Sequence, residues 1–236
     1  MTIQADVPRQ RWQILFSRIG PALRMRQQDI LAEFQRVFTD AGLPVSHTAA
    51  ARPRPRLRLA ASVPAFMELR GDIVEVWFDE LVPLEQVMTA GESLAVGLAI
   101  VDAREVWHGF PSAASQVRGG EYEVPVTTPP GVTADDLRAA VVRLLAATSL
   151  PGQRRRGESE RKSDAAEQDL RPYVQDLEVL EVDEASRTAL LRMQLRLDPS
   201  GAGRPRDVIE ALNLGLVPTR TIRQRLLFVD TPPVAR

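Results

Sequence analysis

The stretch QRWQILFS (residues 10–17) decides how the chain begins to fold, because its side chains alternate closely enough to predict a β-strand. Trp12, Ile14 and Phe16 would share one face of that strand. The stretch QQDILAEFQRVFTDAGLP (residues 27–44) follows, and its apolar residues recur at helical spacing. A helix is therefore predicted there, with an apolar face formed by Ile30, Leu31, Phe34, Val37 and Phe38.

Four further elements complete this half of the chain. Two extended stretches are expected at residues 56–64 and 72–80, the second rich in β-branched and aromatic residues. A second helix is expected to begin near Pro83 and to run through Leu94, and a strand at residues 97–106 closes the set. The order β-α-β-β-α-β is the signature of a ferredoxin-like α+β sandwich.

The same order is predicted to repeat after a linker at residues 107–120, which ends in two glycines. The expected fold class is therefore α+β, with two ferredoxin-like (β-α-β-β-α-β) units in tandem at residues 8–107 and 120–231. The elements expected in the second unit are a strand at 121–128, a helix capped by Thr133, a hairpin across DEAS (183–186), a helix from Pro205 to Gly215 and a strand at 220–230.

The chain contains no cysteine, which excludes disulfides, thiolate zinc sites, iron–sulfur clusters and cysteine nucleophiles. The net charge of -1 gives no general attraction to nucleic acid or membrane, but the charge is segregated along the chain. Residues 1–60 hold ten arginines against four acidic residues, whereas residues 61–110 hold two arginines against nine acidic residues. With neither a signal peptide nor an apolar run long enough to span a bilayer, we expect a soluble cytoplasmic protein.

In the stretch ARPRPRLRLAAS (residues 51–62), every second residue from position 52 to position 58 is an arginine: Arg52, Arg54, Arg56 and Arg58. Residues before proline are held extended, and strand alternation would bring the four guanidiniums to one face. Such neighbours repel one another unless something neutralises them, and three interpretations stay open. The arginines could pair with carboxylates of the neighbouring strand, contact phosphates of an external polyanion, or fit with their prolines into a groove of a partner protein. The candidate carboxylates are Glu68, Glu75, Asp79 and Glu80.

A second basic segment, residues 152–169, is almost free of apolar residues and is expected to form a mobile loop in the second unit. It carries Arg154, Arg155 and Arg156. Two interpretations stay open: the segment is a solvated loop, or it is a flexible basic finger that becomes ordered on an anionic partner.

Catalytic groups are sparse. The two histidines, His47 and His108, lie in expected loops without metal-ligand spacing. The sequence contains no nucleophile elbow, Walker loop, dinucleotide-binding glycine motif or aromatic-rich RNA-binding strand. We therefore expect no catalytic or metal-binding residue here, although a stand-alone RNA-processing or RNA-modifying enzyme stays an alternative.

Four stretches, ILFSRIG, QDILAEFQRVFTDAGLPV, RPRPRLRLA and DLRPYVQDLEV, together resemble the pattern of the bacterial radical-SAM-associated proteins of unknown function. The order and spacing of the stretches carry the resemblance more than any single one. Two histidines of that family are replaced, by Gln27 at the helix entry and by Arg52 before the first Pro-Arg pair. The matching positions are Phe16, Ser17, Arg18, Gly20, Asp29, 41–44, Pro53, Arg54, Pro55, Arg56, Asp169, Arg171 and Pro172.

The resemblance implies that the chain acts with a separate radical SAM enzyme, on RNA or a translation-related target. This chain would hold no cofactor, since it lacks cysteine, and the partner would carry the iron–sulfur cluster and S-adenosylmethionine. We expect an accessory, RNA-binding protein without catalytic activity, and a protein–protein adaptor that ignores RNA is the other alternative. Asp29 would orient an arginine or cap its helix. The expected RNA-contacting residues are Arg18, Arg52, Arg54, Arg56, Arg58, Arg154, Arg155, Arg156 and Arg171.

Overall fold

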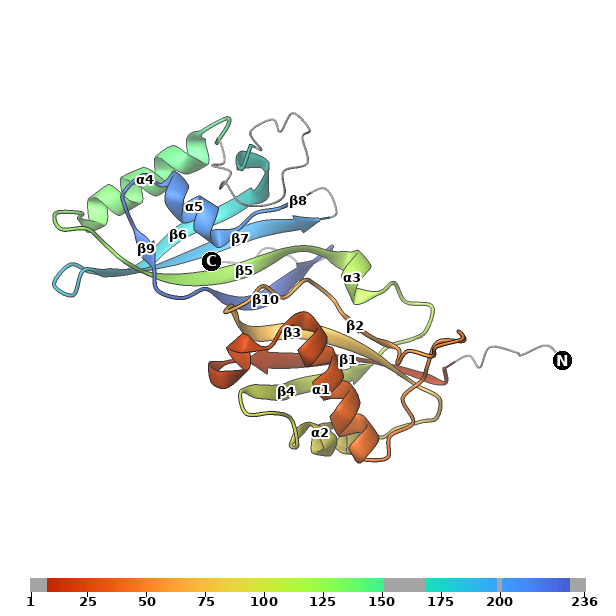
Figure 1. The fold of residues 1–236 in the computed structure, drawn as a ribbon. Helices are drawn as coiled ribbons and strands as arrows, with labels where there is room; N and C mark the ends of the chain where they lie inside the picture. The colour runs from red at the N-terminus through yellow and green to blue at the C-terminus, as the bar shows by residue number, and fades with distance from the viewer. Residues whose placement is uncertain (1–7, 151–168, 199–200, 230–236) are drawn as a thin grey trace. The chain divides into compact units, whose positions relative to one another are not determined.

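The computed structural model describes residues 8–150, 169–198 and 201–229, and it has a mixed α+β architecture (Figure 1). The chain divides into two compact units. Unit 1 comprises Met1–Val117 and Phe228–Arg236, and unit 2 comprises Arg118–Leu227. The Arg154, Arg155 and Arg156 of the expected mobile loop lie outside the described residues.

Unit 1 contains a four-stranded antiparallel sheet whose strand order is β4-β1-β3-β2. The chain order of its elements is the expected one, with short helical turns added after β1 and after β4. The elements are β1 (Gln10–Arg18), η1 (Gly20–Arg24), α1 (Gln27–Asp40), β2 (Leu57–Leu59), β3 (Glu68–Phe78), α2 (Leu84–Gly91), β4 (Leu98–Glu105) and α3 (Ala113–Gln116).

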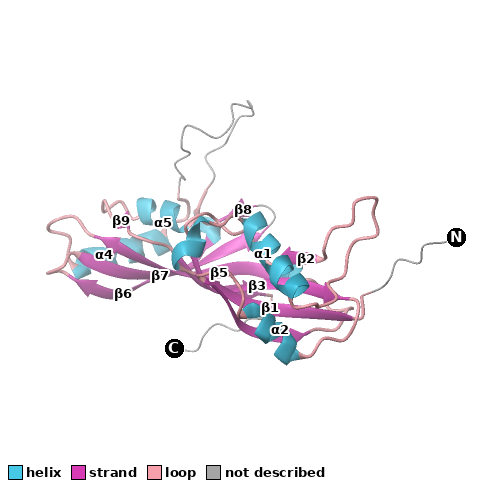
Figure 2. Ribbon diagram, turned by 60° about the horizontal axis from the view of Figure 1, so that its bottom comes forward, coloured by secondary structure: helices cyan, strands magenta, loops and turns pink. Residues whose placement is uncertain are grey.

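The core of unit 1 lies between this sheet and helix α1 (Figure 2). The rings of Phe16 on β1 and Phe34 on α1 meet edge to face, with 5.5 Å between their centroids. Phe38 on α1 meets Phe78 on β3 in the same way at 5.8 Å. All four rings are fully buried. The helical periodicity predicted within residues 27–44 is therefore confirmed, and the apolar face of α1 packs against the sheet.

Unit 2 has a sheet of strand order β10-β5-β7-β6, to which two short strands, β8 and β9, are added on β7 and β5. Counted within each unit, the four main strands of both sheets have the order fourth, first, third, second. The elements are β5 (Val117–Thr127), α4 (Ala134–Ala146), η2 (Arg171–Tyr173), β6 (Val174–Asp183), β7 (Thr188–Asp198), β8 (Gly201–Ala202), α5 (Pro205–Ala211), β9 (Val217–Pro218) and β10 (Ile222–Phe228).

The predicted N-cap of the helix in unit 2 is confirmed. The hydroxyl of Thr133 accepts a hydrogen bond from the backbone N–H of Asp136 at 3.2 Å, and the carboxylate of Asp136 accepts from the backbone N–H of Thr133 at 3.0 Å. These bonds from Thr133 hold the pKa of Asp136 below its ordinary value. They satisfy two of the donors that every helix leaves open at its start.

Two expected boundaries are wrong. The strand expected at residues 56–64 is reduced to Leu57–Leu59, because the chain on both sides of it makes loop contacts instead of ladder bonds. The expected linker at residues 107–120 contains helix α3, whose N-cap Ser112 accepts from the backbone N–H of Ser115, and it ends inside β5. Glycine pairs predict a turn, but the two glycines at 119 and 120 pair with β7 as strand residues.

Among the described helices, none is both long enough and apolar enough to cross a membrane.

Candidate nucleic-acid interface

The four alternating arginines lie on a loop of unit 1, residues 47–58, which we call the arginine loop. His47 and Pro55 form an antiparallel bridge, which brings the two arms of the loop together. The backbone N–H of Thr48 donates to the carbonyl of Arg54 at 2.8 Å, and the N–H of Arg54 donates to the hydroxyl of Thr48 at 3.0 Å. The loop is therefore closed by bonds to the backbone of Arg54, and its arginine side chains take no part in them.

The base of the arginine loop is tied to the end of β3. The N–H of Arg56 donates to the carbonyl of Ser46 at 2.7 Å, and the N–H of Ser46 donates to the carbonyl of Trp77 at 2.8 Å. The N–H of Trp77 in turn donates to the carbonyl of Arg56 at 3.2 Å. This closed set of three bonds fixes both arms of the loop to one strand residue.

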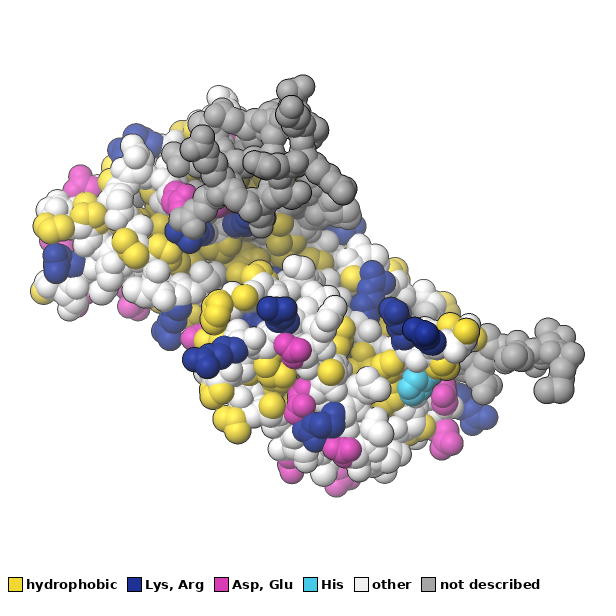
Figure 3. Space-filling view, in the orientation of Figure 1, with side chains coloured by type: hydrophobic (Ala, Val, Ile, Leu, Met, Phe, Trp, Pro, Cys, Tyr) yellow, Lys and Arg dark blue, Asp and Glu magenta, His cyan; other side chains and the backbone are white. Residues whose placement is uncertain are grey.

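The guanidiniums of the arginine loop have no hydrogen bond or ion pair with any residue that the structure describes. The side chains of Arg52, Arg54 and Arg58 are exposed, and that of Arg56 is half-buried. Figure 3 shows basic side chains gathered over this part of unit 1. The expectation that all four share one strand face is wrong, because Arg58 alone belongs to a strand, β2. The result is a cluster of positive charge on a loop.

Two of the four carboxylates expected to neutralise these arginines have other partners. Arg58 lies opposite Glu75 in the β2–β3 pairing, but the side chain of Glu75 is fully buried and forms an ion pair with Arg11. Glu68 forms an ion pair with Arg70 at 3.1 Å. Of the three interpretations of the arginine row, pairing within the neighbouring strand therefore finds no support at these two carboxylates.

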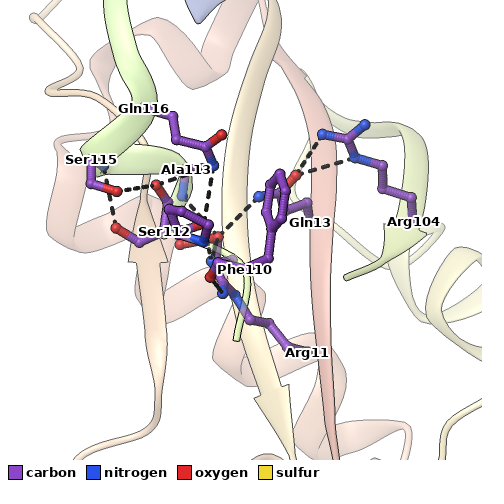
Figure 4. Close-up of polar contacts among 10 residues, drawn as sticks. Arg11, Gln13, Arg104, Phe110, Ser112, Ala113, Ser115 and Gln116 are labelled. Carbon is purple, nitrogen blue, oxygen red and sulfur yellow. Dashed lines mark hydrogen bonds and ion pairs between the residues drawn. The ribbon is translucent and has the colours of Figure 1, made fainter. Parts of the chain in front are cut away.

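The face of the sheet opposite α1 carries a buried polar cluster (Figure 4). At its centre, one carboxylate oxygen of Glu75 is shared by the guanidinium of Arg11, the amide of Gln13 at 3.1 Å and the backbone N–H of Ala113 at 3.0 Å. Arg11 also donates to the carbonyl of Phe110 at 2.6 Å. The cluster therefore fastens the segment 110–116, which we call the strap, to this face of unit 1.

An aromatic ring of the sheet lies against the same cluster. Arg11 is 3% exposed and its guanidinium lies over the ring of Trp77, 5.3 Å from the ring centroid. Sequence reasoning missed Arg11 and Gln13, and it named Glu75 only as a candidate partner of the alternating arginines. The available signal was the position of Glu75 within the apolar run IVEVWF (residues 73–78), since such a residue needs a buried partner.

Arg18 does not reach solvent, so its expected contact with RNA is wrong. Its side chain is fully buried at the end of β1. The guanidinium donates to the carbonyl of Met25 at 2.9 Å, to that of Pro64 at 2.6 Å and to that of Met67 at 3.2 Å. Arg18 thus holds together two chain segments of unit 1.

Arg171 is likewise a structural residue in unit 2, and the expectation that it contacts RNA is not supported by its position. Its guanidinium donates to the carbonyls of Leu145 at 2.9 Å and Ala147 at 3.1 Å, at the C-terminal end of α4. A cation at this end of a helix satisfies open carbonyls and complements the helix dipole. Asp169 accepts from the backbone N–H groups of Leu150 at 2.7 Å and Arg171 at 2.9 Å.

The other positions shared with the radical-SAM-associated pattern also have structural roles. Asp29 caps α1, since its carboxylate accepts from the backbone N–H of Arg26 at 2.7 Å. Gly20 has a φ of +52°, a value that favours glycine, where the chain leaves β1. Phe16 lies in the core, Ser17 is half-buried on β1, Pro53 and Pro55 lie in the arginine loop, Pro172 lies in η2, and Gln27 begins α1.

The chain is similar in structure to chains of several solved protein complexes. A chain in the crystal structure of a Cbf5–Nop10–Gar1 complex matches with a TM-score of 0.50 and 12% identity over 91% of this chain and 48% of that chain. A chain of an H/ACA RNP bound to a substrate RNA containing 2'-deoxyuridine matches with a TM-score of 0.48 and 12% identity, over 90% and 46%. A chain of the archaeal box H/ACA sRNP Nop10–Cbf5 complex gives 0.45 and 14%, over 96% and 50%.

The first of these likenesses shows a shared fold alone, because the identity is very low. The chain spans about half the length of the solved chains that it matches. No curated protein matches the sequence. A family model does match residues 11–205, which include β1, the arginine loop, the strap and the Asp169–Arg171 turn. The chain therefore belongs to DUF2344, the family described as an uncharacterized protein conserved in bacteria.

Proposed function

We propose that this protein is an accessory RNA-binding protein whose arginine loop contacts phosphates. The observation that carries the proposal is the set of four arginines, Arg52, Arg54, Arg56 and Arg58, whose guanidiniums lack a carboxylate partner among the described residues. Four neighbouring cations repel one another, and an external polyanion relieves that repulsion. The planar guanidinium fork binds phosphate oxygens in pairs, which suits arginine to this task.

The loop architecture supports the same proposal. The loop is closed by backbone bonds at Thr48 and tied to β3 at Trp77, so its arginines are held near one another without being used as structural links. Less backbone entropy is then lost on binding. The likeness to the Cbf5–Nop10–Gar1 chain adds only that a fold of this kind occurs in RNA–protein assemblies.

The test is the salt dependence of RNA binding by the variant R52A/R54A. Each phosphate contact on a single strand contributes about -0.7 to the slope of log K against log salt concentration, so losing two contacts reduces its magnitude by about 1.4. Fluorescence anisotropy with a short unstructured oligouridylate measures that slope. Alanine leaves the backbone bonds between Arg54 and Thr48 intact.

The matched control is R138A/R206A, which removes the same charge from exposed arginines of unit 2. Arg138 pairs with Asp135 at 3.2 Å and Arg206 with Glu210 at 3.0 Å, so both are already neutralised. The control should keep the wild-type slope. Equal slopes for R52A/R54A and wild type would show that the arginine loop does not contact phosphate.

The second part of the proposal is that the protein acts with a separate radical SAM enzyme. This part rests on the resemblance to the radical-SAM-associated pattern of four stretches, ILFSRIG, QDILAEFQRVFTDAGLPV, RPRPRLRLA and DLRPYVQDLEV. We expect the tagged protein to co-purify with a radical SAM enzyme from its native cells, identified by mass spectrometry and by the absorbance of an iron–sulfur cluster. Co-purification that survives ribonuclease would place the contact between the proteins. Recovery of the protein without any such enzyme would contradict the proposed partner, and the proposed RNA binding would then be tested by itself.

We infer further that the two units are tandem ferredoxin-like domains, near the expected bounds 8–107 and 120–231 but with the strap added to the first domain and the start of β5 to the second. The common order of the four main strands, fourth, first, third, second, supports this inference in both units. The alternation of helices and strands in the chain supports it as well.

A further inference from the structure

An exposed phenylalanine stands in a strained backbone conformation in the loop between β2 and β3. The side chain of Phe66 is 68% exposed. Its backbone φ is +60°, in the left-handed region that bulky residues rarely adopt. Glycine would fit this backbone without strain, and the exposed ring gains little from burial. The residue is therefore unfavourable for folding on both counts, and such strain persists where the surrounding structure enforces it.

The enforcing structure is the buried Arg18. Its guanidinium binds the carbonyl of Pro64 at 2.6 Å and that of Met67 at 3.2 Å, which are the two sides of the loop that carries Phe66. The backbone N–H of Phe66 donates to the carbonyl of Leu23 at 3.2 Å. A fully buried cation thus fixes the loop that presents one exposed aromatic ring.

Exposed positive charge lies on the chain segment to which Phe66 is bonded. The backbone N–H of Phe66 donates to the carbonyl of Leu23, and Arg24 and Arg26, one and three residues further along, have exposed side chains. Neither guanidinium forms an ion pair within the part of the chain that the structure describes. Asp29 lies close by, with its carboxylate bound to the backbone N–H of Arg26 at 2.7 Å.

We propose that Phe66 is a stacking platform for an unpaired RNA base, with Arg24 and Arg26 contacting the adjoining phosphates. An exposed ring with exposed cations on the adjoining segment is a combination that single-stranded nucleic acid binds, because the ring stacks on a base and the cations contact the phosphates. This inference rests on the proposed RNA binding and adds a base contact to it. It also assigns Arg18 a purpose, which is to position Phe66.

The test compares two probes of equal length, an oligouridylate and an abasic strand with the same phosphates. On the oligouridylate we expect F66A to bind roughly 5- to 150-fold more weakly than wild type, since one stacked base contributes that much. F66W should bind at least as tightly as wild type, because a larger ring remains. On the abasic strand F66A and wild type should bind equally, whereas R24A/R26A should weaken binding to both probes.

The matched control is L81A, which removes an apolar side chain that is 72% exposed elsewhere in unit 1. It should bind both probes as wild type does. If wild type binds neither probe, the proposed RNA binding itself fails. If wild type binds and F66A binds the oligouridylate equally well, the stacking inference alone is overturned. It is overturned too if F66A loses equal affinity for both probes, and thermal unfolding of F66A shows whether a folding defect is the cause.

Discussion

At the scale of single residues, the buried pair of Arg11 and Glu75 should make the stability sensitive to the loss of either partner. Both side chains are nearly inaccessible, at 3% and 0% exposure, and the carboxylate also holds Gln13 and the strap. A buried pair is no gain over well-packed apolar residues, but removal of one partner strands the other charge.

We therefore expect Glu75→Ala to lower the free energy of unfolding by about 3–5 kcal/mol, because Arg11 then stays buried without a countercharge. Urea denaturation followed by circular dichroism measures the change. The double variant R11M/E75L should recover much of the loss, since neither charge remains. An equally large loss in R11M/E75L would mean that packing of the strap, and not the stranded charge, sets the stability.

The burial of Arg18 could not be predicted from the sequence. Its position next to Gly20 fits an exposed turn as well as a buried link. The carbonyls that bind it belong to Met25, Pro64 and Met67, and the last lies 49 residues away along the chain. Periodicity assigns a side chain to a face of its own element, but burial of a cation depends on acceptors that other elements supply.

At the scale of elements, the turn at Asp169 joins the end of α4 to the start of β6. The backbone N–H groups of Leu150 and Arg171 donate to its carboxylate and hold the pKa of Asp169 below its ordinary value. Arg171 then binds the last carbonyls of α4. The Asp-x-Arg-Pro stretch therefore has a structural meaning that its resemblance to other sequences did not reveal.

The depressed pKa predicts a pH dependence for Asp169→Asn. Because the folded state favours the charged carboxyl, the stabilisation from Asp169 is present at neutral pH and is lost as the pH falls through the folded pKa. The stability difference between wild type and Asp169→Asn should be largest near neutrality and should shrink in acid. Chemical denaturation at a series of pH values measures it, with Asp135→Asn, an exposed carboxyl, as the control. A difference that is constant with pH would contradict the assigned cause.

At the scale of the whole molecule, local patterns predicted most of the architecture. The helical spacing of Phe34 and Phe38 and the cap at Thr133 are confirmed, and the α+β class with its order of elements follows from such signals. The tandem ferredoxin-like organisation stays a prediction.

The candidate interface could be predicted only in part. Glu75 lies opposite Arg58 but pairs with Arg11 instead, and this ion pair joins residues that are far apart in the sequence. Phe66 gave no signal, because nothing local distinguishes a strained phenylalanine from a relaxed one. The strap lies within the expected linker at residues 107–120, because that stretch carries glycine and proline and the partners that fasten the strap lie elsewhere in the chain.

The Asp169 turn has a consequence for how the family can diversify. The N–H of Leu170 donates to the carbonyl of Leu150 at 2.8 Å, so the chain comes back to the point from which it departed. Whatever number of residues intervenes, the rest of unit 2 meets the same two anchored ends. In general, lengthening a loop between two fixed ends costs only about 0.6 kcal/mol for each doubling of its length. Insertions and deletions should therefore accumulate at this position among relatives, and new binding specificities could be acquired there without redesigning the scaffold.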